Sequence, residues 1–582
     1  MRRLLHYLKG YEKETVLAPL FKMLEACFEL LVPLVVAAIV DTGIQNRDVV
    51  QIWRQGGLLV LLAAVGLLSS VTAQYFAAKT ALGYGTALRR DLYHHINTLS
   101  YTELDGIGTP TLVTRMTSDI NQLQNGVNMT LRLLLRSPFI VIGALIMALS
   151  ISPQMTAWFL LVTVLISLVI YLIMRITVPR YHQAQSMLDK VTLLTRENYV
   201  GTRVVRAFSR QKDEIRDFTE TNDTLKKVQT TAGRISALMN PMTYLIVNFG
   251  IIVVLVRGGA LVNEGALTQG EIIALISYMN QILTNLLRMA DLVISVTRAL
   301  ASGIRVNELL KTATGMPDPA LTGAKKLAPV AAAPTVAFDH VTFTYKNAGA
   351  PSLTDLDFRA MSGQTIGVIG GTGSGKSTLV NLIARFYNAS EGTVALYGHD
   401  VRQYPLAQLR TMIGVVPQRA VLFTGTIRDN MRWACPNATD EQIWSALEIA
   451  QAADFVRGKP GGLDEPVETA GRNFSGGQRQ RLTIARALVP RPAILILDDS
   501  ASALDYATDA ALRKALKEKT SGMTVFIVSQ RATAVQHADR ILVLDDGALA
   551  GSGTHAELLK TCEVYREICL SQLSREEVEK TV

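Results

Sequence analysis

Residues 365–387 read TIGVIGGTGSGKSTLVNLIARFY and decide the fold of the C-terminal half of the chain. A β-branched run leads into GGTGSGKST, and an apolar-periodic helix follows. The spacing is G-x-x-x-x-G-K-S in the strand–loop–helix context that this motif needs. Glycines let backbone N–H groups close around phosphate oxygens, and the helix N-terminus adds its positive end. The loop residues are Gly370, Gly371, Thr372, Gly373, Ser374, Gly375, Lys376, Ser377 and Thr378.

A second apolar strand, residues 493–497, ends in two carboxylates. Within the loop, Lys376 is expected to reach the β- and γ-phosphates, and the Ser377 hydroxyl to ligate Mg²⁺. A carboxylate at the end of a buried strand beside such a loop is well placed to hold the Mg²⁺ shell, a role that we assign to Asp498. Asp499 follows where a general base for the attacking water would sit.

Between these two motifs lies FSGGQRQR, residues 474–481, followed by another apolar-periodic helix. Ser475 and the N–H groups at this helix start form a second phosphate-binding turn. One chain does not obviously need two such turns, so the second is expected to serve another molecule's nucleotide. The residues of this turn are Ser475, Gly476, Gly477 and Gln478.

The N-terminal half of the chain is apolar. Over all 582 residues, hydrophobic residues make up 49% and charged ones 18%, against about 25% charged in soluble domains. Six segments approach the roughly 20 residues that span a bilayer. This composition excludes a disordered or fibrous chain, and the spans exclude a soluble ATPase of nucleic-acid repair, so no nucleic-acid partner is expected. The segments are 15–43, 57–84, 133–152, 155–177, 237–262 and 270–297.

The long connections between these segments carry most of the basic residues. They are residues 85–132 and 178–236, and the positive-inside tendency places them in the cytoplasm together with both termini. Their helical periodicity predicts extensions of the membrane helices. A stretch rich in Pro, Ala and Gly then marks a linker. The predicted domains are 1–310 (transmembrane), 311–334 (linker) and 335–582 (nucleotide-binding).

The order of these motifs resembles the ATP-binding cassette (ABC) family. The six preceding spans resemble its half-size exporters, of the P-glycoprotein and lipid-flippase type. The resemblance implies a polytopic helical exporter fold in the cell membrane, fused to a cytoplasmic α/β P-loop cassette that uses ATP and Mg²⁺. It also implies that two cassettes pair head to tail, each ATP lying between one chain's phosphate loop and the other's signature. By the same resemblance Tyr345 stacks on adenine, Gln418 touches Mg²⁺, and Asp505 ends the SALD turn at the dimer seam.

Two positions depart from the family pattern. The family has Glu where this chain has Asp499, and His where it has Gln530. Asp is one methylene shorter, which withdraws its carboxylate by about 1 Å and can cost about 10²-fold in rate. Gln cannot become cationic as the transition state gains charge. The sequence therefore predicts the degenerate-site subunit of a heterodimeric bacterial multidrug exporter; the alternative is a homodimer with slow hydrolysis at both sites.

The cargo is less clearly encoded. In the sixth span a polar stripe predicts a substrate cavity, or packing on a neighbouring helix. Glu25 and Glu29 share a helix face and would attract cationic drugs, or pair with a basic residue. Amphipathic small molecules are the leading cargo, lipids or peptides the second, and an ATP-gated channel the third interpretation. Membrane lipids are expected contacts, and loops near 107–118 and 203–214 are expected to transmit cassette closure. The stripe comprises Tyr278, Gln281, Asn285 and Arg288.

Overall fold

The structure is a computed structural model that describes residues 2–322, 326–346, 348–500 and 503–573. The chain forms two compact units, which we call the membrane unit (up to 97, and 110–312) and the cassette unit (98–109, and from 313 on). The boundary between residues 312 and 313 lies inside the predicted linker, 311–334. The assignment of the segment 98–109 to the cassette unit differs from the predicted transmembrane domain 1–310, which contained it.

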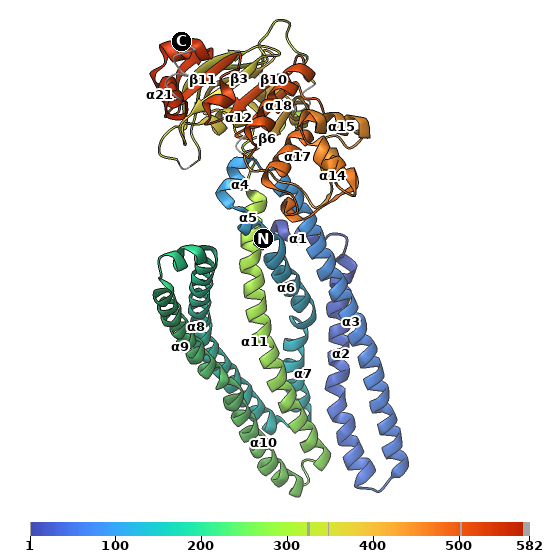
Figure 1. The fold of residues 1–582 in the computed structure, drawn as a ribbon. Helices are drawn as coiled ribbons and strands as arrows, with labels where there is room; N and C mark the ends of the chain where they lie inside the picture. Colours follow the sequence, from blue (N-terminus) through green and yellow to red (C-terminus); the bar gives the residue numbers. More distant parts are fainter. Residues whose placement is uncertain (1, 323–325, 347, 501–502, 574–582) are drawn as a thin grey trace. The chain divides into compact units, whose positions relative to one another are not determined.

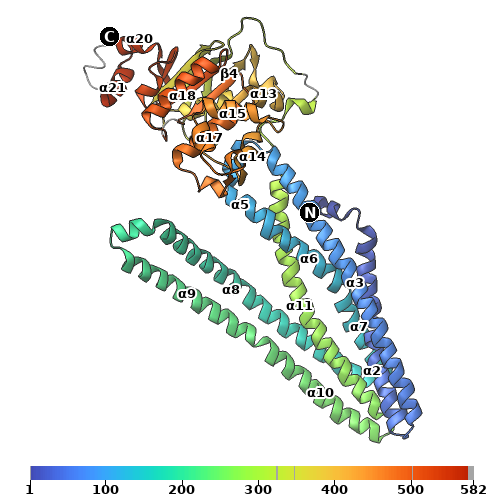
Figure 2. The ribbon, with the colours of Figure 1, turned by 45° about the vertical axis from the view of Figure 1, so that its right-hand side comes forward.

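The membrane unit is built from long helices (Figure 1). α8 has 55 residues and α3 has 50, and 55 residues extend to about 80 Å, well beyond a hydrocarbon core of about 30 Å. The long connections are therefore helical, and α8 and α9 run side by side in Figures 1 and 2. The helices are α1 (Arg2–Leu5), α2 (Glu12–Ala38), α3 (Val49–Thr98), α5 (Thr109–Thr114), α6 (Ile120–Leu133), α7 (Arg136–Ile151), α8 (Pro153–Ala207), α9 (Gln211–Ala237), α10 (Met239–Asn263) and α11 (Gln269–Lys311).

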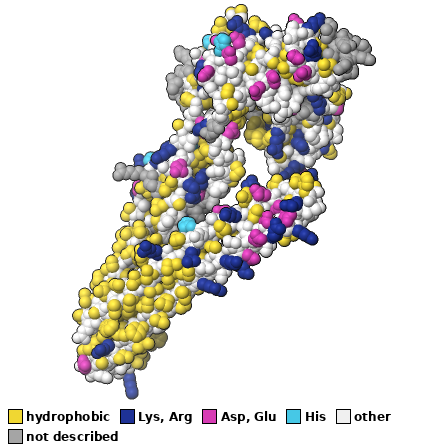
Figure 3. Space-filling view, turned by 90° about the vertical axis from the view of Figure 1, so that its left-hand side faces the viewer, with side chains coloured by type: hydrophobic (Ala, Val, Ile, Leu, Met, Phe, Trp, Pro, Cys, Tyr) yellow, Lys and Arg dark blue, Asp and Glu magenta, His cyan; other side chains and the backbone are white. Residues whose placement is uncertain are grey.

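Five helical stretches within the described residues are long and apolar enough to cross a membrane. They correspond to the first five predicted spans. α11, which contains the predicted sixth span, carries polar residues along its length, so the count of six stays a prediction. Exposed hydrophobic side chains gather in one broad zone of the membrane unit, where charged side chains are sparse (Figure 3).

Small residues let α11 pack closely on its neighbours in the membrane unit. A Cβ on Gly270 would lie 2.3 Å from the Ala37 carbonyl oxygen of α2, and one on Gly126 would lie 2.3 Å from the Ala299 Cβ. Such close approach is typical of membrane helix pairs, which lack a hydrophobic driving force and rely on packing. α11 thereby contacts α2, α6, α7 and α10.

Two sheets form the centre of the cassette unit. The six-stranded sheet has the order β12-β11-β3-β10-β9-β6, and only its edge strand β12 pairs antiparallel. The carboxyl ends of parallel strands meet at one edge, which is where ligands bind in such sheets. This topology brings the ends of β3, β9 and β10 together. The strands are β3 (Thr365–Gly370), β6 (Ile413–Val416), β9 (Ile494–Asp498), β10 (Thr524–Val528), β11 (Arg540–Asp545) and β12 (Ala548–Gly553).

The other sheet is antiparallel, with the order β2-β1-β4-β5. Its strands are β1 (Val336–Phe343), β2 (Leu353–Ala360), β4 (Glu391–Leu396) and β5 (His399–Asp400), and β7 (Gly425–Thr426) pairs with β8 (Pro466–Val467) separately. The helices of this unit are α4 (Tyr101–Ile107), α12 (Lys376–Ile383), α13 (Leu406–Met412), α14 (Ile427–Arg432), α15 (Asp440–Ile449), α16 (Ala453–Arg457), α17 (Gly476–Leu488), α18 (Tyr506–Lys519), α19 (Ala532–Val535), α20 (His555–Thr561) and α21 (Glu563–Gln572).

α4 is held in the cassette unit by aromatic and polar contacts. The Tyr101 ring lies 4.9 Å from that of Phe386, and the Tyr387 hydroxyl donates to Asp105 Oδ2 at 2.6 Å. Burial, reinforced by Asp105, raises the pKa of Tyr387, so the phenol keeps the proton that it donates. The same Tyr387 ring lies 5.2 Å from the ring of Tyr345. One side chain thus touches both α4 and the residue predicted to stack on adenine.

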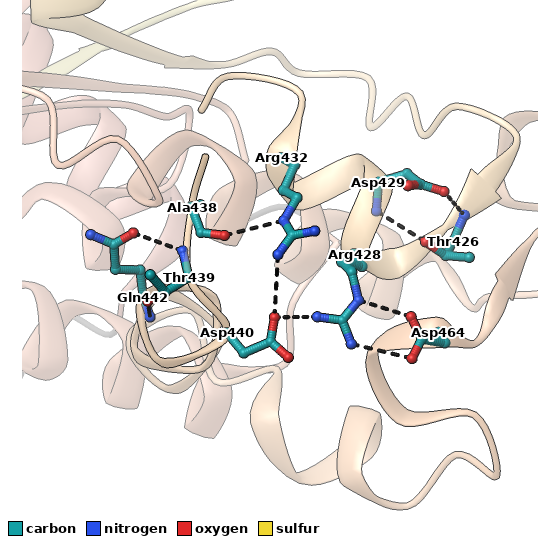
Figure 4. A network of polar contacts seen from close by, with 9 residues as sticks. All are labelled: Thr426, Arg428, Asp429, Arg432, Ala438, Thr439, Asp440, Gln442 and Asp464. Carbon is teal, nitrogen blue, oxygen red and sulfur yellow. Dashed lines mark hydrogen bonds and ion pairs between the residues drawn. The ribbon is translucent and has the colours of Figure 1, made fainter. Parts of the chain in front are cut away.

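An arginine joins three segments of the helical layer around α14 (Figure 4). The Arg428 guanidinium donates to both carboxylate oxygens of Asp464, at 2.8 and 3.2 Å, and also pairs with Asp440. Arg428 holds the pKa of Asp464 below its usual range. A bidentate contact between a guanidinium and a carboxylate, within a network of several charges, is the geometry in which a partly exposed ion pair contributes to stability.

We expect the Arg428→Gln variant to melt a few degrees lower than the parent at neutral pH. Because the folded pKa of Asp464 is depressed, its contribution is complete above the unfolded pKa and is lost as pH falls through the folded pKa. The melting difference should therefore shrink toward about pH 3, as scanning fluorimetry would measure. Arg457→Gln, which breaks a more exposed pair with Glu448, is the control. A difference that grows on acidification would contradict this account.

Candidate nucleotide-binding site

The predicted phosphate loop joins the end of β3 to the start of α12. Gly373 and Gly375 have φ of +85° and +92°, a region that glycine enters without a Cβ penalty. Lys376 Nζ donates to the carbonyl oxygens of Gly370, at 3.0 Å, and Gly371, at 2.5 Å. Burial lowers the pKa of Lys376, against the opposing effect of the nearby carboxylates. A partly buried cation in a glycine-rich loop at a helix N-terminus is suited to a polyphosphate.

The predicted metal ligands lie at the end of β9. Ser377 Oγ donates to Asp498 Oδ1 at 2.9 Å. Burial raises the pKa of Asp498, and the charge of Asp499 raises it further. A desolvated carboxylate beside a hydroxyl provides the oxygen donors that Mg²⁺ prefers, and a divalent cation would offset the cost of keeping that carboxylate charged. Ser377 and Asp498 therefore fit the metal.

Gln418 follows β6 and reaches the same edge of the sheet. Its Nε2 donates to Asp499 Oδ2 at 3.3 Å, so Gln418 contacts the residue that follows Asp498, the predicted metal ligand. Asp499 has a left-handed backbone with φ of +44° and donates its N–H to the Val528 carbonyl at 2.9 Å. Its direction is thus fixed by β10. The predicted metal and catalytic residues form one group.

The second departure from the family pattern borders the same loop. Gln530 Oε1 accepts a hydrogen bond from Thr372 Oγ1 at 3.4 Å. Gln530 comes shortly after β10, which pairs with both β3 and β9. Asp499 and Gln530 therefore both lie beside the phosphate loop of this chain.

Tyr345 stands beside the start of α12. Its hydroxyl is hydrogen-bonded to Thr378 Oγ1 at 3.0 Å, and its ring meets that of Phe343 edge-on at 4.8 Å. The aromatic ring predicted to stack on adenine is therefore anchored to the helix that follows the phosphate loop.

The second predicted phosphate-binding turn begins α17. Ser475 is its N-cap, and Ser475 and Gln478 form a capping box with hydrogen bonds of 3.0 and 3.3 Å. Ser475 and Gly476 are exposed. Asp505 caps α18 by accepting from the Thr508 N–H at 2.9 Å; Ser502, at the start of the SALD turn, lies outside the described residues. The turn at Ser475 therefore leaves the N-terminus of α17 exposed, which suits binding of an anion held by a second molecule.

Comparison with known proteins identifies the family. Residues 15–286 match the family model of the ABC transporter transmembrane region, and residues 353–502 match that of the ABC transporter itself. An uncharacterized ABC transporter ATP-binding protein of Mycobacterium tuberculosis is 37% identical over 97% of each chain. The chain belongs to the ABC transporter family.

This ABC transporter has relatives with named cargo and a solved structural neighbour. A probable multidrug resistance ABC transporter of Bacillus subtilis is 33% identical over 88% of this chain and 87% of that protein. A fatty acid ABC transporter of M. tuberculosis is 34% identical over 83% and 75%, respectively. The fold matches that of a bacterial Atm1-family ABC exporter with a TM-score of 0.80, at 23% identity, over 97% of this chain and 98% of the other.

The match and the family together confirm a half-size exporter: a helical membrane domain fused to a cytoplasmic ATP-binding cassette, whose ATP hydrolysis drives transport across the membrane. Exporters of this kind act as dimers.

The predicted polar stripe on α11 of this ABC exporter does not face a single environment: some of its residues pack against α2, and Arg288 borders a cavity. Tyr278 is fully buried and donates to the Leu30 carbonyl of α2 at 2.7 Å, and Gln281 Nε2 donates to the Glu29 carbonyl at 3.3 Å. These two follow the packing alternative. Asn285 is also buried. Arg288 borders a cavity.

Of the two interpretations of the carboxylates in the first span, the structure shows pairing with a basic residue: Glu25 and Glu29 both pair with Arg136. Sequence reasoning missed Lys22, Arg132 and Arg136, which border the same cavity as Arg288. A basic residue inside or beside an apolar span is itself a signal of a functional site, and it could have drawn attention to them.

Proposed function

We propose that this chain is the degenerate-site half of a heterodimeric exporter of amphipathic small molecules. The observation that carries the proposal is the meeting of two departures at one nucleotide site: Asp499 contacts Gln418 at 3.3 Å, and Gln530 contacts Thr372 at 3.4 Å. Both weaken hydrolysis at the site built on this chain's phosphate loop, whereas the signature turn at Ser475 keeps the family pattern. The relative named as a multidrug transporter supports the cargo class.

In this mechanism the two nucleotide sites have different tasks. This chain's phosphate loop and Tyr345 bind ATP and keep it, which holds the paired cassettes together. Ser377 and Asp498 would hold Mg²⁺, which neutralises phosphate charge when it is bound. The signature turn completes the partner's site, where hydrolysis resets the cycle. ATP works because it binds the closed pair more tightly than the open one.

Vanadate trapping of the transporter, purified from its native membranes through a tag on this chain, tests the proposal. We expect two different half-transporters to co-purify, with the trapped nucleotide cross-linked only to the partner's Walker motifs. A single kind of chain, labelled fully and coupled to transport, would establish the homodimer instead. Equal labelling of two different chains would overturn the degenerate site.

Lipid export is the second candidate function. The observation that favours it is the relative named as a fatty acid transporter, which is 34% identical over 83% of this chain. Transport of labelled fatty acids and of cationic dyes by the reconstituted pair would separate the two cargo classes.

Removing the carboxylate at the end of β9 should abolish the metal dependence of nucleotide binding. We expect Asp498→Asn to weaken ATP binding in the presence of Mg²⁺ by on the order of 10–100-fold, and to leave binding in excess EDTA nearly unchanged. Asp545→Asn, at the exposed end of strand β11 in the same sheet, is the control. Equilibrium binding of a fluorescent ATP analogue measures both; an equal loss with and without the metal would contradict the assignment.

A further inference from the structure

The membrane unit contains a cavity of about 420 Å³, within the range of about 300–1,000 Å³ that holds small ligands. Its wall is formed by side chains from α2, α3, α6, α7 and α11. Four cations lie in this wall with a single carboxylate, and polar groups and Met129 complete much of it. The charged residues are Lys22, Glu25, Arg132, Arg136 and Arg288.

The acidic groups here are already paired within the chain. Lys22 Nζ lies 2.5 Å from Glu25 Oε2, and Arg136 lies 2.6 Å from Glu29 Oε2 and 3.7 Å from Glu25 Oε1. Two carboxylates are thus matched by two buried cations, Lys22 and Arg136, whose side chains are 8% and 7% exposed. These carboxylates are therefore not free to receive a cationic ligand.

Two further cations remain without acidic partners. Within the described part of the chain, neither Arg132 nor Arg288 forms an ion pair, and the Nε atoms of Arg132 and Arg136 are buried without a hydrogen-bond partner. Arg136 is more than nine-tenths buried and borders the cavity. Unpaired donors on a desolvated guanidinium are costly, and an anion within hydrogen-bond distance removes that cost.

The depth of the cluster fits an amphiphile. Arg288 lies about five turns, or roughly 28 Å, from the N-terminus of α11, and Arg136 lies about four turns, or roughly 22 Å, from the C-terminus of α7. Both of those helix ends adjoin short connections, which the predicted topology places on the side of the membrane opposite the cytoplasm. Since the hydrocarbon core is about 30 Å thick, the cations lie near its cytoplasmic edge, where the headgroup of a molecule arriving from the inner leaflet would be.

We propose that this cavity selects amphiphiles with a negatively charged headgroup, which Arg132 and Arg288 bind; the inference rests on the export of amphipathic molecules proposed above. The paired Lys22, Glu25, Glu29 and Arg136 hold the site open and together carry no net charge, so the net positive charge of the cavity comes from Arg132 and Arg288. Met129 supplies adaptable apolar surface. A second cavity of about 650 Å³ shares Met129 and Arg132 with the first, so the site continues along α6 and α11.

The test compares two probes that differ in one charge. The transporter in nanodiscs of neutral phosphatidylcholine is titrated with 11-(dansylamino)undecanoic acid or its methyl ester, and empty nanodiscs are subtracted. We expect the acid to bind at least about tenfold more tightly than the ester. Arg288→Gln and Arg132→Gln should each abolish most of this preference, and Arg288→Lys should retain it.

Arg175→Gln is the matched control, because Arg175 is exposed on α8 at a similar depth and does not border either cavity. It should keep the full preference. Equal affinity for acid and ester in the parent, or an equal loss in Arg175→Gln, would overturn the anionic selectivity while leaving amphiphile export standing. Binding of neither probe, by a protein that still binds ATP, would instead count against the proposed cargo class.

Discussion

Replacing Asp499 by Glu and Gln530 by His in the same chain should raise the ATP hydrolysis rate of the purified chain by about 10²-fold. The longer carboxylate regains about 1 Å toward the water, and an imidazole can carry positive charge as the γ-phosphate leaves. Asp499 lies close enough to Lys376 of the phosphate loop to raise its pKa, and Gln530 contacts Thr372 of the same loop, so the double variant should exceed the product of the single ones. Phosphate release with saturating ATP and Mg²⁺ measures all three.

Asp546→Glu provides the control for the added methylene. Asp546 has the same left-handed backbone, with φ of +43° against +44° at Asp499, and is exposed. Any cost of a longer side chain in that conformation appears there without touching the nucleotide. A parent chain that already hydrolyses ATP at the rate of the double variant would show that these two residues do not limit it.

Removing the Ser475 hydroxyl should lower ATP turnover of the transporter, purified with its partner, by about 10²-fold or more. The signature serine would donate to the γ-phosphate held by the partner, and loss of one such donor typically costs 10²–10³-fold in rate. ATP binding at this chain's own phosphate loop should persist, because Ser475 belongs to the opposite site. Steady-state ATPase and photolabelling with azido-ATP on Ser475→Ala separate the two effects.

Ser475 also caps α17, so the variant needs a control for the lost cap. Thr439 caps α15 in the same way: it accepts from the Gln442 N–H at 3.4 Å, where Ser475 accepts from that of Gln478 at 3.3 Å. Thr439→Ala should lose a similar stability, about 1 kcal/mol, and keep its turnover. If both variants lose turnover equally, the effect is structural and the signature role fails.

The nucleotide site was predictable because each motif is local and the sheet topology does the rest. The residue types of Gly373, Gly375 and Lys376 alone predict the phosphate-binding turn and the helix that follows it. Asp498 ends β9 and Gln530 follows β10, and the parallel order β3-β10-β9 brings the carboxyl ends of these strands together. What the local pattern could not supply was the contact of Gln418 with Asp499, because it depends on side-chain direction.

The side-chain contacts of the membrane unit were harder to predict from the sequence. Helical periodicity grouped Tyr278, Gln281 and Arg288 on one polar face of α11, but it could not tell which neighbour each would meet. The deciding partners are distant in sequence: the Tyr278 hydroxyl reaches Leu30, and Arg136 reaches Glu29. Nor could hydropathy show that residues 98–109 cluster with the cassette unit, since that depends on aromatic contacts with Phe386 and Tyr387.

Tyr387 links Tyr345, the residue predicted to stack on adenine, to α4. Its ring rests edge-on against Tyr345, and its phenol grips Asp105 of α4. If a purine base reorients Tyr345, we expect the Tyr387 ring to shift with it, and the Tyr387 hydroxyl is bound to Asp105 in the segment that leads into α5 and α6. Nucleotide binding would then act on α4 through the rings of Tyr345 and Tyr387, before any large domain movement begins.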